Sequence, residues 1–296
     1  MDNDELRDKI IQNIERIISK SFVSESGPFD ISIIPQTSRY ICDGSGQMLR
    51  PRLVLGASRP YKVQQKTSLW YGAILEIVHA GTLALDDLPC MDNADLRRGK
   101  PSCHRTFGET RTILSCYSLD SDLREAIYLT SLKIEKQRVI EKEINIAQKT
   151  LSIGQEADIS QTRMARTLDD FALIYDWKTG TLMGAAAAIG AILGDAEKSD
   201  VNHLRNFGRN IGISYQFFDD WKDRYCNEEE VRKSVGLDVR KNTPFNIAEP
   251  ELVLVESLKH RGMALKELSK IKGKRFKELV TLSIHMFSLK KAQPSR

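Results

Sequence analysis

Two acidic stretches, each at the end of an apolar segment, constrain this 296-residue chain more than any other feature. The first runs from Asp86 to Asp92 and the second from Asp219 to Asp223. Several carboxylates beside buried apolar residues cost on the order of several kcal/mol unless a cation compensates them. Two such stretches therefore predict a shared cluster of hard metal ions, and such ions bind phosphate-bearing substrates.

Apolar residues recur at helical spacing along almost the whole chain. Helices are predicted over 4–21, 66–85, 167–190 and 198–225, with two amphipathic helices within 250–288. A capping box variant from Thr167 to Asp170 starts the helix over 167–190. The small residues from Gly184 to Gly190 either let helices approach closely, which is the favoured interpretation, or leave room for a long apolar ligand. Residues 22–45 are rich in Ser, Pro and Gly and predict an irregular connection, and residues 119–125 predict a turn leading into a helix. No alternating strand pattern stands out. The predicted fold is a single all-α domain over residues 1–296.

Composition argues against several classes of protein. A net charge of +4, without a nucleic-acid-binding motif, predicts no nucleic-acid partner. No run of about eighteen uncharged apolar residues is present, so no membrane span is expected. The acidic N-terminal segment lacks the features of a signal or transit peptide. Five widely spaced cysteines without a CxxC pair indicate free thiols in a reducing compartment, which predicts a cytoplasmic protein.

Polar and cationic residues surround the first acidic stretch. His79 precedes Asp86 by seven residues, two helical turns, so both lie on one helix face. A lone histidine here is either a satisfied core residue or a ligand-contact residue, and its position leaves the two alternatives about even. Arg97 and Arg98 follow Asp92 closely, and paired arginines suit phosphate oxygens.

Other candidates lie farther along the chain. A glycine-rich turn with Arg50 and Arg52 next to a helix start either holds an anion or is a plain turn with surface arginines. Lys178 lies in an apolar stretch and needs a charged partner, which a diphosphate would provide. Asp219 and Asp223 are one helical turn apart and are suited to bridging one Mg²⁺. The many lysines within 250–288 favour a solvated face, with an anionic membrane surface as the alternative.

These motifs, in this order, resemble the trans-isoprenyl diphosphate synthases, or polyprenyl synthetase family, over roughly residues 40–250. The first stretch has the DDxxxxD form followed by RRG, and the second has the DDxxD form. Further residues fall where the family has matching ones: Gly154, Gln155, Asp158, Lys178, Thr179, Gly180 and Gln216. The resemblance implies antiparallel helices around a central active-site cavity, and a homodimer.

The resemblance also implies a reaction in which isopentenyl diphosphate condenses with an allylic diphosphate (dimethylallyl, geranyl or farnesyl) after Mg²⁺-assisted ionisation. About three Mg²⁺ per site are expected, held by Asp86, Asp87, Asp92, Asp219, Asp220 and Asp223. The allylic diphosphate would meet Arg97, Lys178, Lys233 and Lys241. The isopentenyl diphosphate would meet Arg50, His79 and Arg98, with Gln47 beside them. Residues expected to act in catalysis are Asp86, Asp87, Asp92, Lys178, Asp219, and Thr179 and Gln216, which would face the allylic carbocation.

The chain departs from the family pattern at several positions. Gln47 stands where a lysine is usual, which removes one cation from the isopentenyl diphosphate site. Leu85 stands where many members have histidine, the GDALL segment after the first motif is absent, and the stretch from Lys233 to Thr243 is shorter than usual. The alternative function is a non-catalytic regulatory subunit of a heteromeric prenyl diphosphate synthase. A class I terpene cyclase is a third hypothesis, against which Arg97, Arg98 and the second motif argue.

Product length follows from a steric argument. The growing alkyl tail should run along the helix that carries the first motif, so residues about one turn before Asp86 would form the pocket floor. These are Gly81 and Thr82, where short-chain members often carry a bulky aromatic residue. The expected product is therefore geranylgeranyl diphosphate (C20), with farnesyl diphosphate (C15) as the alternative.

Overall fold

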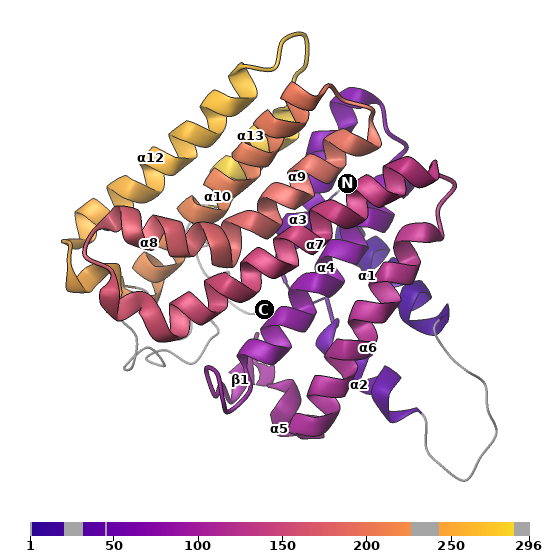
Figure 1. The fold of residues 1–296 in the computed structure, drawn as a ribbon, viewed down its shortest axis with the longest axis horizontal. Coiled ribbons are helices and arrows are strands. Elements are labelled where there is room, and N and C mark those ends of the chain that lie inside the picture. The colour runs from indigo at the N-terminus through magenta and orange to yellow at the C-terminus, as the bar shows by residue number, and fades with distance from the viewer. Residues whose placement is uncertain (1, 21–31, 45, 226–242, 287–296) are drawn as a thin grey trace, which may run out of the picture.

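The computed structural model describes residues 2–20, 32–44, 46–225 and 243–286, and these are helical almost throughout (Figure 1). The helices are α1 (Asn3–Lys20), α2 (Ile33–Ile41), α3 (Leu49–Ser58), α4 (Gln65–Asp86), α5 (Cys103–Phe107), α6 (Glu109–Tyr128), α7 (Ile134–Glu156), α8 (Leu168–Tyr175), α9 (Thr181–Leu193), α10 (Lys198–Tyr225), α12 (Pro250–Ser269) and α13 (Lys277–His285). Single turns of 3₁₀ helix cover Arg59–Tyr61, Thr162–Met164 and Pro244–Asn246. The predicted all-α class is confirmed.

Helix α9 lies at the centre of the bundle and packs against α3, α7 and α10. Its run of Gly and Ala lets neighbouring backbones approach closely. A Cβ on Gly208 of α10 would lie 2.3 Å from the Met183 carbonyl oxygen, and one on Gly190 would lie 2.6 Å from the Val54 carbonyl oxygen. The sequence-based interpretation of these small residues as close helix packing is confirmed.

Helix α4 is the long apolar helix of the core. It packs against α1, α3 and α6, and Ile10, Ile14 and Ile17 of α1 are buried in the same core. In the described part of the chain it is the one helix long and apolar enough to cross a membrane, and 67% of that apolar window is buried by the rest of the bundle. Burial of this kind is typical of a core helix.

Two segments differ from the sequence-based prediction. Residues 33–41, expected to be irregular, form α2, because Pro35 lies in the first turn, where a missing N–H costs no helical hydrogen bond. Residues 119–125 form no turn but continue α6. Asp120 accepts hydrogen bonds from Arg124, one turn later at 2.9 Å, and from Gln148 of α7 at 2.8 Å. Those contacts stabilise polar residues inside a helix.

A short hairpin was also not predicted. Strands β1 (Leu96–Arg97) and β2 (Lys100–Pro101) pair antiparallel and are the one strand pairing in the described ranges. The two residues between them, Arg98 and Gly99, have φ values of 56° and 81°. A two-residue hairpin turn of type I′ needs positive φ at both central positions, and glycine at the second adopts it without strain.

Helix α8 begins at the capping box that the sequence predicted: the Thr167 hydroxyl accepts a hydrogen bond from the Asp170 N–H, and the Asp170 carboxylate accepts one from the Thr167 N–H. The chain then passes through a π-helical turn, Asp176–Gly180, directly into α9. A second π-helical turn, Ala157–Gln161, extends α7. The last turn of α7 lies against the Asp176–Gly180 turn, since a Cβ on Gly154 would be 2.3 Å from the Lys178 nitrogen, and the two π-helical turns are joined by the Lys178–Asp158 ion pair.

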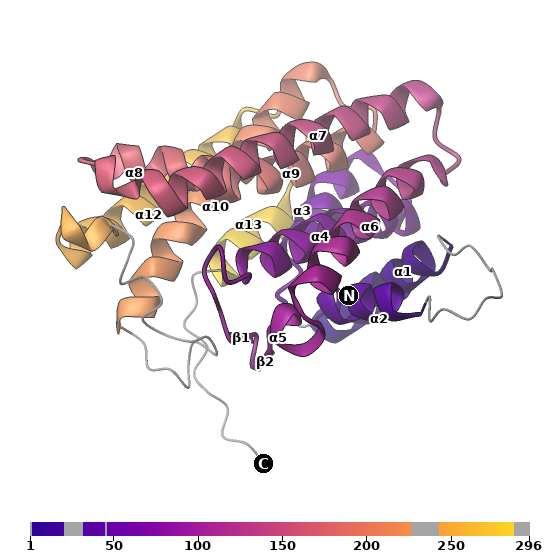
Figure 2. The same ribbon diagram turned by 60° about the horizontal axis from the view of Figure 1, so that its bottom comes forward.

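Helices α4 and α10, which carry the acidic stretches, end on the same side of the bundle (Figures 1 and 2). The C-terminal end of each helix points toward the lower left in both views. Residues 130 positions apart in the sequence are therefore brought to one side of the molecule.

The described cysteines, Cys42, Cys90, Cys103 and Cys116, are free thiols as predicted, and Cys226 lies outside the described residues.

Candidate active site

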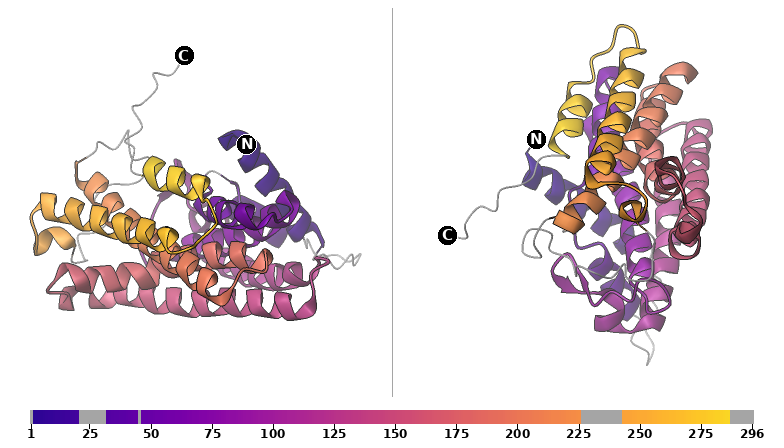
Figure 3. Two further views of the ribbon diagram at one scale, coloured as in Figure 1. Left: turned by 90° about the horizontal axis from the view of Figure 1, so that it is seen from above. Right: turned by 90° about the vertical axis from the view of Figure 1, so that its left-hand side faces the viewer.

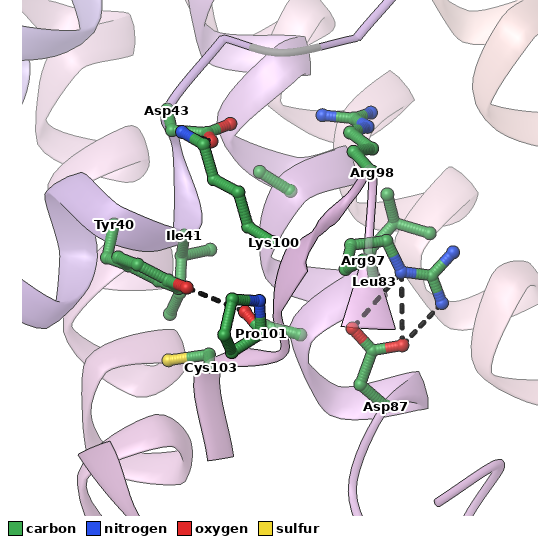
Figure 4. Close-up of a pocket in the computed structure, with 12 residues that line it drawn as sticks. Tyr40, Ile41, Asp43, Leu83, Asp87, Arg97, Arg98, Lys100, Pro101 and Cys103 are labelled. Atoms are coloured by element: carbon green, nitrogen blue, oxygen red, sulfur yellow. Dashed lines mark hydrogen bonds and ion pairs between the residues drawn. The ribbon is translucent and has the colours of Figure 1, made fainter. Parts of the chain in front are cut away.

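The first acidic stretch folds back on the end of α4. The Asp92 N–H donates to the Asp86 carbonyl oxygen at 2.9 Å, and the Ala94 N–H donates to that of Asp87 at 3.2 Å. Asp87 is only 1% exposed. Its carboxylate accepts hydrogen bonds from Arg97 Nε at 3.1 Å to each oxygen and a further one from Arg97 Nη2 (Figure 4). The bidentate geometry holds Arg97 at the helix end.

The hairpin that carries Arg97 and Arg98 is attached to α2. Lys100 Nζ lies 2.7 Å from Asp43 Oδ2, and the Tyr40 hydroxyl donates to the Pro101 carbonyl oxygen at 2.6 Å (Figure 4). A narrow pocket of about 40 Å³ lies between the hairpin, α2 and α4. The attachment fixes both arginines relative to the loop that follows α2.

The negative charge of Asp86 is not fully balanced by neighbouring cations. Burial raises its pKa to about 6, and the nearby Asp92 and Asp87 add to the rise, while Lys178 and Arg97 oppose it. Lys178 affects the pKa of Asp86 although it belongs to a different element, the π-helical turn between α8 and α9. Lys178 is therefore close enough to act electrostatically on the first acidic stretch.

Lys178 and Asp158 form the connection between the two acidic stretches. Lys178 Nζ donates to Asp158 Oδ2 at 2.5 Å, and both side chains are mostly buried. Asp158 in turn helps to raise the pKa of Asp220. A continuous electrostatic chain thus runs from Asp86 through Lys178 and Asp158 to Asp220.

In the second acidic stretch, Asp220 accepts hydrogen bonds from α8 and from α10 itself. Burial raises the pKa of Asp220 to about 7, although the Tyr175 hydroxyl donates to its Oδ2 and Gln216 Nε2 donates to its Oδ1 at 3.2 Å. Thr179 Oγ1 donates to Gln216 Oε1 at 3.1 Å. The predicted pair Thr179 and Gln216 is therefore in direct contact beside Asp220.

Asp219 lies on the neighbouring part of α10 and pairs with Lys222, whose Nζ is 2.9 Å from Oδ1. Asp223 belongs to α10, but its side chain lies outside the described residues. Lys233 and Lys241, predicted to bind the allylic diphosphate, also lie outside them. Their roles stay predictions.

A second cluster of basic groups consists of Arg50 of α3, His79 of α4, two turns before Asp86, and Arg98 of the hairpin. Arg50 is buried, and burial lowers its pKa to about 10, an effect that Glu76 opposes and Arg98 reinforces. The pKa of His79 is held well below its usual range by burial and by Arg50, Arg98 and Arg97. These are the predicted isopentenyl diphosphate residues, and the structure brings them together.

Gln47 occupies the edge of this cluster. Its side chain is exposed, and its carbonyl oxygen accepts a hydrogen bond from Arg52 Nε at 3.2 Å. The guanidinium of Arg98 covers the neighbouring Gly46, since a Cβ there would be 2.6 Å from Nη2. A side chain at position 46 would therefore displace the end of Arg98, and the Gln47 position faces solvent where a lysine would add positive charge.

Sequence reasoning did not assign roles to several polar residues of the site. Asp158 pairs with Lys178, Tyr175 bonds Asp220, and Glu76 lies buried beside Arg50. Gln155 is buried with neither side-chain amide atom hydrogen-bonded to a described residue, and Glu76 Oε2 is likewise without a partner. Glu76 carried a signal in the sequence, because it is a charged residue inside the apolar run 66–85, whereas the pattern does not distinguish Tyr175 from an aromatic core residue.

The donor set fits Mg²⁺. The residues are carboxylates, which are hard oxygen ligands. The raised pKa values of Asp86 and Asp220 show that their ionised forms lack a sufficient positive partner in the protein itself. Within the described ranges no three metal-ligating side chains converge on one point, and Asp87 and Asp219 pair with Arg97 and Lys222.

The predicted pocket floor is open. Nothing lies within 4 Å of the position that a Cβ on Gly81 would occupy. The side chain of Cys116 on α6 contacts this glycine, with its Sγ 3.5 Å from the Gly81 carbonyl oxygen. Small groups on both α4 and α6 thus leave space one turn before Asp86.

Comparisons with known proteins agree with this geometry. A family model described as Polyprenyl synthetase matches residues 31–278. The farnesyl diphosphate synthase of Bacillus subtilis (strain 168) is 34% identical over 243 residues, which cover 79% of this chain and 80% of that protein. Geranylgeranyl pyrophosphate synthase 4 of Arabidopsis thaliana is 34% identical over 233 residues, which cover 76% of this chain and 61% of that protein.

Solved structures show the same fold. A geranyltransferase from Legionella pneumophila aligns with a TM-score of 0.78 at 26% identity, covering 96% of each chain. A geranyltransferase from Helicobacter pylori, complexed with magnesium and isoprenyl diphosphate, aligns with a TM-score of 0.78 at 22% identity, covering 97% of this chain and 96% of that one. The chain belongs to the polyprenyl synthetase family, the family of the farnesyl and geranylgeranyl diphosphate synthases that it matches.

Proposed function

We propose that this member of a trans-prenyltransferase family condenses isopentenyl diphosphate with an allylic diphosphate and releases geranylgeranyl diphosphate. The observation that carries the proposal is the continuous chain from Asp86 through Lys178 and Asp158 to Asp220, which unites the two acidic stretches. The separate cluster around Arg50 and His79 supplies a second diphosphate site. Two diphosphate-binding sites side by side suit a reaction between two diphosphates.

The protein groups would act by neutralising the leaving diphosphate. Arg97 and Lys178, both beside Asp86, would donate charge-assisted hydrogen bonds to diphosphate oxygens as the C–O bond breaks. Lys178 would exchange its Asp158 partner for the substrate. Bound Mg²⁺ would add Lewis-acid stabilisation of the same leaving group, with Asp86, Asp92 and Asp220 among the carboxylates that hold it. The number of ions, about three, follows from the family resemblance.

Thr179 and Gln216 would face the allylic carbon chain. Their oxygen atoms lie within one hydrogen-bonded pair beside Asp220. Oxygen dipoles directed at a developing positive charge stabilise it without forming a bond. The proton lost in the last step would go to the departing diphosphate, so no tuned histidine base is needed. The neutral state of His79, favoured by burial and three arginines, suits a hydrogen-bonding role instead.

Product length is proposed from the open space at Gly81. A C20 tail needs room past the first turn before Asp86, and no atom blocks it at this glycine. Replacing Gly81 with Phe would fill that space, so the expected product shortens from C20 to C15 while the first condensations continue. Thr82→Val, a change of similar size to the native side chain, is the matched control and should leave the C20 product unchanged.

A homodimer is proposed on the basis of an exposed apolar stripe on α7. Val139, Ile146 and Ile153 are exposed, and their spacing of seven residues places them on one helix face. Ile113 and Tyr117 of α6 are exposed as well. Apolar rows of this length on two helices are typical of surfaces that a second subunit covers.

The test is an elongation assay on the purified single chain with dimethylallyl diphosphate, labelled isopentenyl diphosphate and Mg²⁺. Prenyl products up to C20 are expected, and chelation of Mg²⁺ should abolish them. Asp86→Asn and Asp219→Asn should each lower kcat by at least about a hundredfold. Asp4→Asn, at an exposed position on α1, is the control and should leave kcat unchanged.

The regulatory-subunit alternative predicts a different outcome. The single chain would then make no product and would bind another synthase tightly. No observation in the described residues favours this alternative, and the relatives reported above are named as synthases or geranyltransferases. A cyclase would release a hydrocarbon from one prenyl diphosphate without isopentenyl diphosphate.

A further inference from the structure

Helix α12 has apolar side chains on two faces, of which one is covered. Its inner face packs against α10, where Ser257 Oγ donates to the Ser214 carbonyl oxygen at 2.8 Å and His260 Nδ1 lies 2.9 Å from Asn210 Oδ1. These pairs set α12 antiparallel to α10. Figures 1 and 3 place α12, orange to yellow, at an outer edge of the bundle. The buried hydrogen bonds prevent the helix from turning its other face inward.

The outer face of α12 exposes a row of large apolar side chains. Leu252 is 52% exposed, Val255 56%, Leu258 44% and Met263 45%. Gly262 lies on the same face, and nothing lies within 4 Å of the position its Cβ would occupy. Single exposed apolar residues are common on protein surfaces, but a contiguous row along one helix indicates a surface that binds an apolar partner.

The second half of α12 and the turn after it are strongly basic. Residues 259–277 contain eight of the 44 Lys and Arg residues of the chain but one of its 40 acidic residues, so the remainder of the chain is slightly acidic. The exposed cations of this segment are Lys259, Lys266, Lys270, Lys272, Lys274, Arg275 and Lys277. Lys266 lies eleven residues after Val255, three helical turns, and therefore on the same outer face.

Only part of this charge is neutralised by neighbours. Lys259 pairs with Glu256 at 2.7 Å, and Lys270 pairs with Glu267. Lys266 and Lys272 form no ion pair with another described residue. The unneutralised cations lie at the C-terminal end of the apolar row, so apolar contact and positive charge are available to one partner at the same time.

We propose that the outer face of α12 and the basic turn after it dock this protein on an anionic lipid surface. The apolar row would enter the headgroup boundary while the lysines pair with lipid phosphates, the arrangement found for amphipathic helices that lie in the membrane plane. Charge complementarity favours this partner, because each Lys or Arg near an anionic membrane strengthens binding by about fivefold. The face is a single helix at the edge of the bundle, and it presents a ridge to a flat surface.

Docking would also orient the active site. Helix α12 runs antiparallel to α10, so its N-terminal half lies beside the part of α10 that leads to Asp219, with Val253 and Phe217 in one buried cluster. A prenyl chain formed next to that segment would then be released close to the lipid. This surface would bind lipid whether or not the reaction proposed above is correct.

The test is cosedimentation of the full chain with vesicles of phosphatidylcholine alone or of phosphatidylcholine with phosphatidylglycerol. Binding is expected only to the anionic vesicles and should fall strongly in about 0.5 M NaCl. Lys266→Glu with Lys272→Glu should weaken binding by about tenfold or more. Val255→Ser with Leu258→Ser should weaken it at low salt as well. The control, Arg16→Glu with Arg111→Glu, makes the same charge change at exposed positions on α1 and α6 and should bind as the unmodified protein does.

Circular dichroism and prenyl elongation without vesicles should be unchanged in all these variants, which excludes misfolding. Equal binding to neutral and anionic vesicles would overturn the proposal. So would an absence of binding, an equal loss of binding in the control variant, or self-association of the chain that only the Val255 and Leu258 substitutions abolish.

Discussion

At the scale of single residues, the site consists of buried charges that are compensated in pairs. Asp87 has Arg97, and Asp158 has Lys178, whereas Asp86 and Asp220 form no ion pair with a described lysine or arginine. Burial raises the pKa of Asp87 even with its partner, and it raises the pKa of Asp86 to about 6 and that of Asp220 to about 7. The paired groups are held in place before substrate arrives. The uncompensated ones supply negative charge for the cations that accompany a diphosphate.

The Asp87–Arg97 pair yields a prediction about stability. Arg97→Ala leaves a nearly fully buried carboxylate unpaired, so the free energy of unfolding should fall by about 3–5 kcal/mol. Arg97→Lys keeps the charge but not the two parallel hydrogen bonds and should lose less. Denaturant unfolding at neutral pH, with Mg²⁺ chelated, measures both. A loss below about 1 kcal/mol in Arg97→Ala would mean that the pair contributes little.

Gln47 yields a prediction about substrate affinity. Its side chain is exposed at the edge of the cluster around Arg50 and Arg98. Gln47→Lys adds a cation there, so KM for isopentenyl diphosphate should fall by about fivefold with little change in kcat. Gln47→Met, which is similar in length and uncharged, is the control. If both variants have the KM of the unmodified protein, position 47 does not contact the diphosphate.

At the scale of elements, close contact of the π-helical turn Asp176–Gly180 with α7 and α10 positions Lys178. The backbone of Gly154 at the end of α7 touches the Lys178 backbone, and Gly180 in turn touches Gly212 of α10. Three helices thus meet at glycines around the residue that connects the two acidic stretches. The arrangement tolerates no added atoms at these contacts.

Gly154→Ala should therefore separate α7 from the turn that carries Lys178. We expect a loss of unfolding free energy of about 1–3 kcal/mol and a drop in kcat, because the new methyl group would lie 2.3 Å from a backbone nitrogen. Gly262→Ala is the matched control, since it makes the same change in α12 where no atom lies within 4 Å. That variant should gain about 0.5–1 kcal/mol. Equal effects of the two substitutions, measured by thermal unfolding, would contradict the packing argument.

The accuracy of the sequence-based prediction differed between elements, because their sequence patterns differ in strength. Helices with a strong apolar period, such as α4 and α10, were predicted to within a few residues, and so was the capping box at Thr167. Helix α2 was missed because its Pro and Ser resemble a loop composition. The hairpin was missed because a two-residue strand is too short for an alternating pattern, although Arg98–Gly99 carried the turn signal.

The residues of the candidate site were also predicted only in part. Asp86, Lys178 and Asp220 were singled out from charge in or beside apolar helices, and Gln216 from the family resemblance. In the structure Lys178 acts electrostatically on Asp86, and Gln216 is hydrogen-bonded to Asp220. The sequence could not show which charges pair with one another. Lys178 and Asp158 are twenty positions apart in the sequence, and their contact depends on how the two π-helical turns pack. No local sequence pattern predicts that packing.

At the scale of the whole molecule, separate faces differ in their chemistry and therefore suit different partners. The α7 stripe of Val139, Ile146 and Ile153 is apolar with a regular seven-residue spacing, whereas the α12 face combines apolar and basic groups. The first suits a second copy of the chain and the second suits an anionic lipid surface. The two acidic stretches open on a third side, where α4 and α10 end (Figure 2).

The dimer proposal predicts the outcome of a charge substitution. Val139→Asp with Ile146→Asp places two carboxylates in the proposed interface, so sedimentation velocity should show a shift from dimer to monomer. Val255→Asp with Leu258→Asp makes the same change on α12 and should leave the dimer intact. A dimer that survives the α7 substitutions would show that its interface lies elsewhere.

The central claim, that one chain joins two diphosphates and extends the product to C20, is tested most directly by product length. The measurement is mass spectrometry of the prenyl diphosphates that the purified chain makes from dimethylallyl and isopentenyl diphosphates with Mg²⁺. A predominant C20 product that shortens to C15 in Gly81→Phe is the predicted result. A C10 product would contradict the tail-pocket argument, and no condensation at all, or a hydrocarbon from a single prenyl diphosphate, would contradict the assigned reaction.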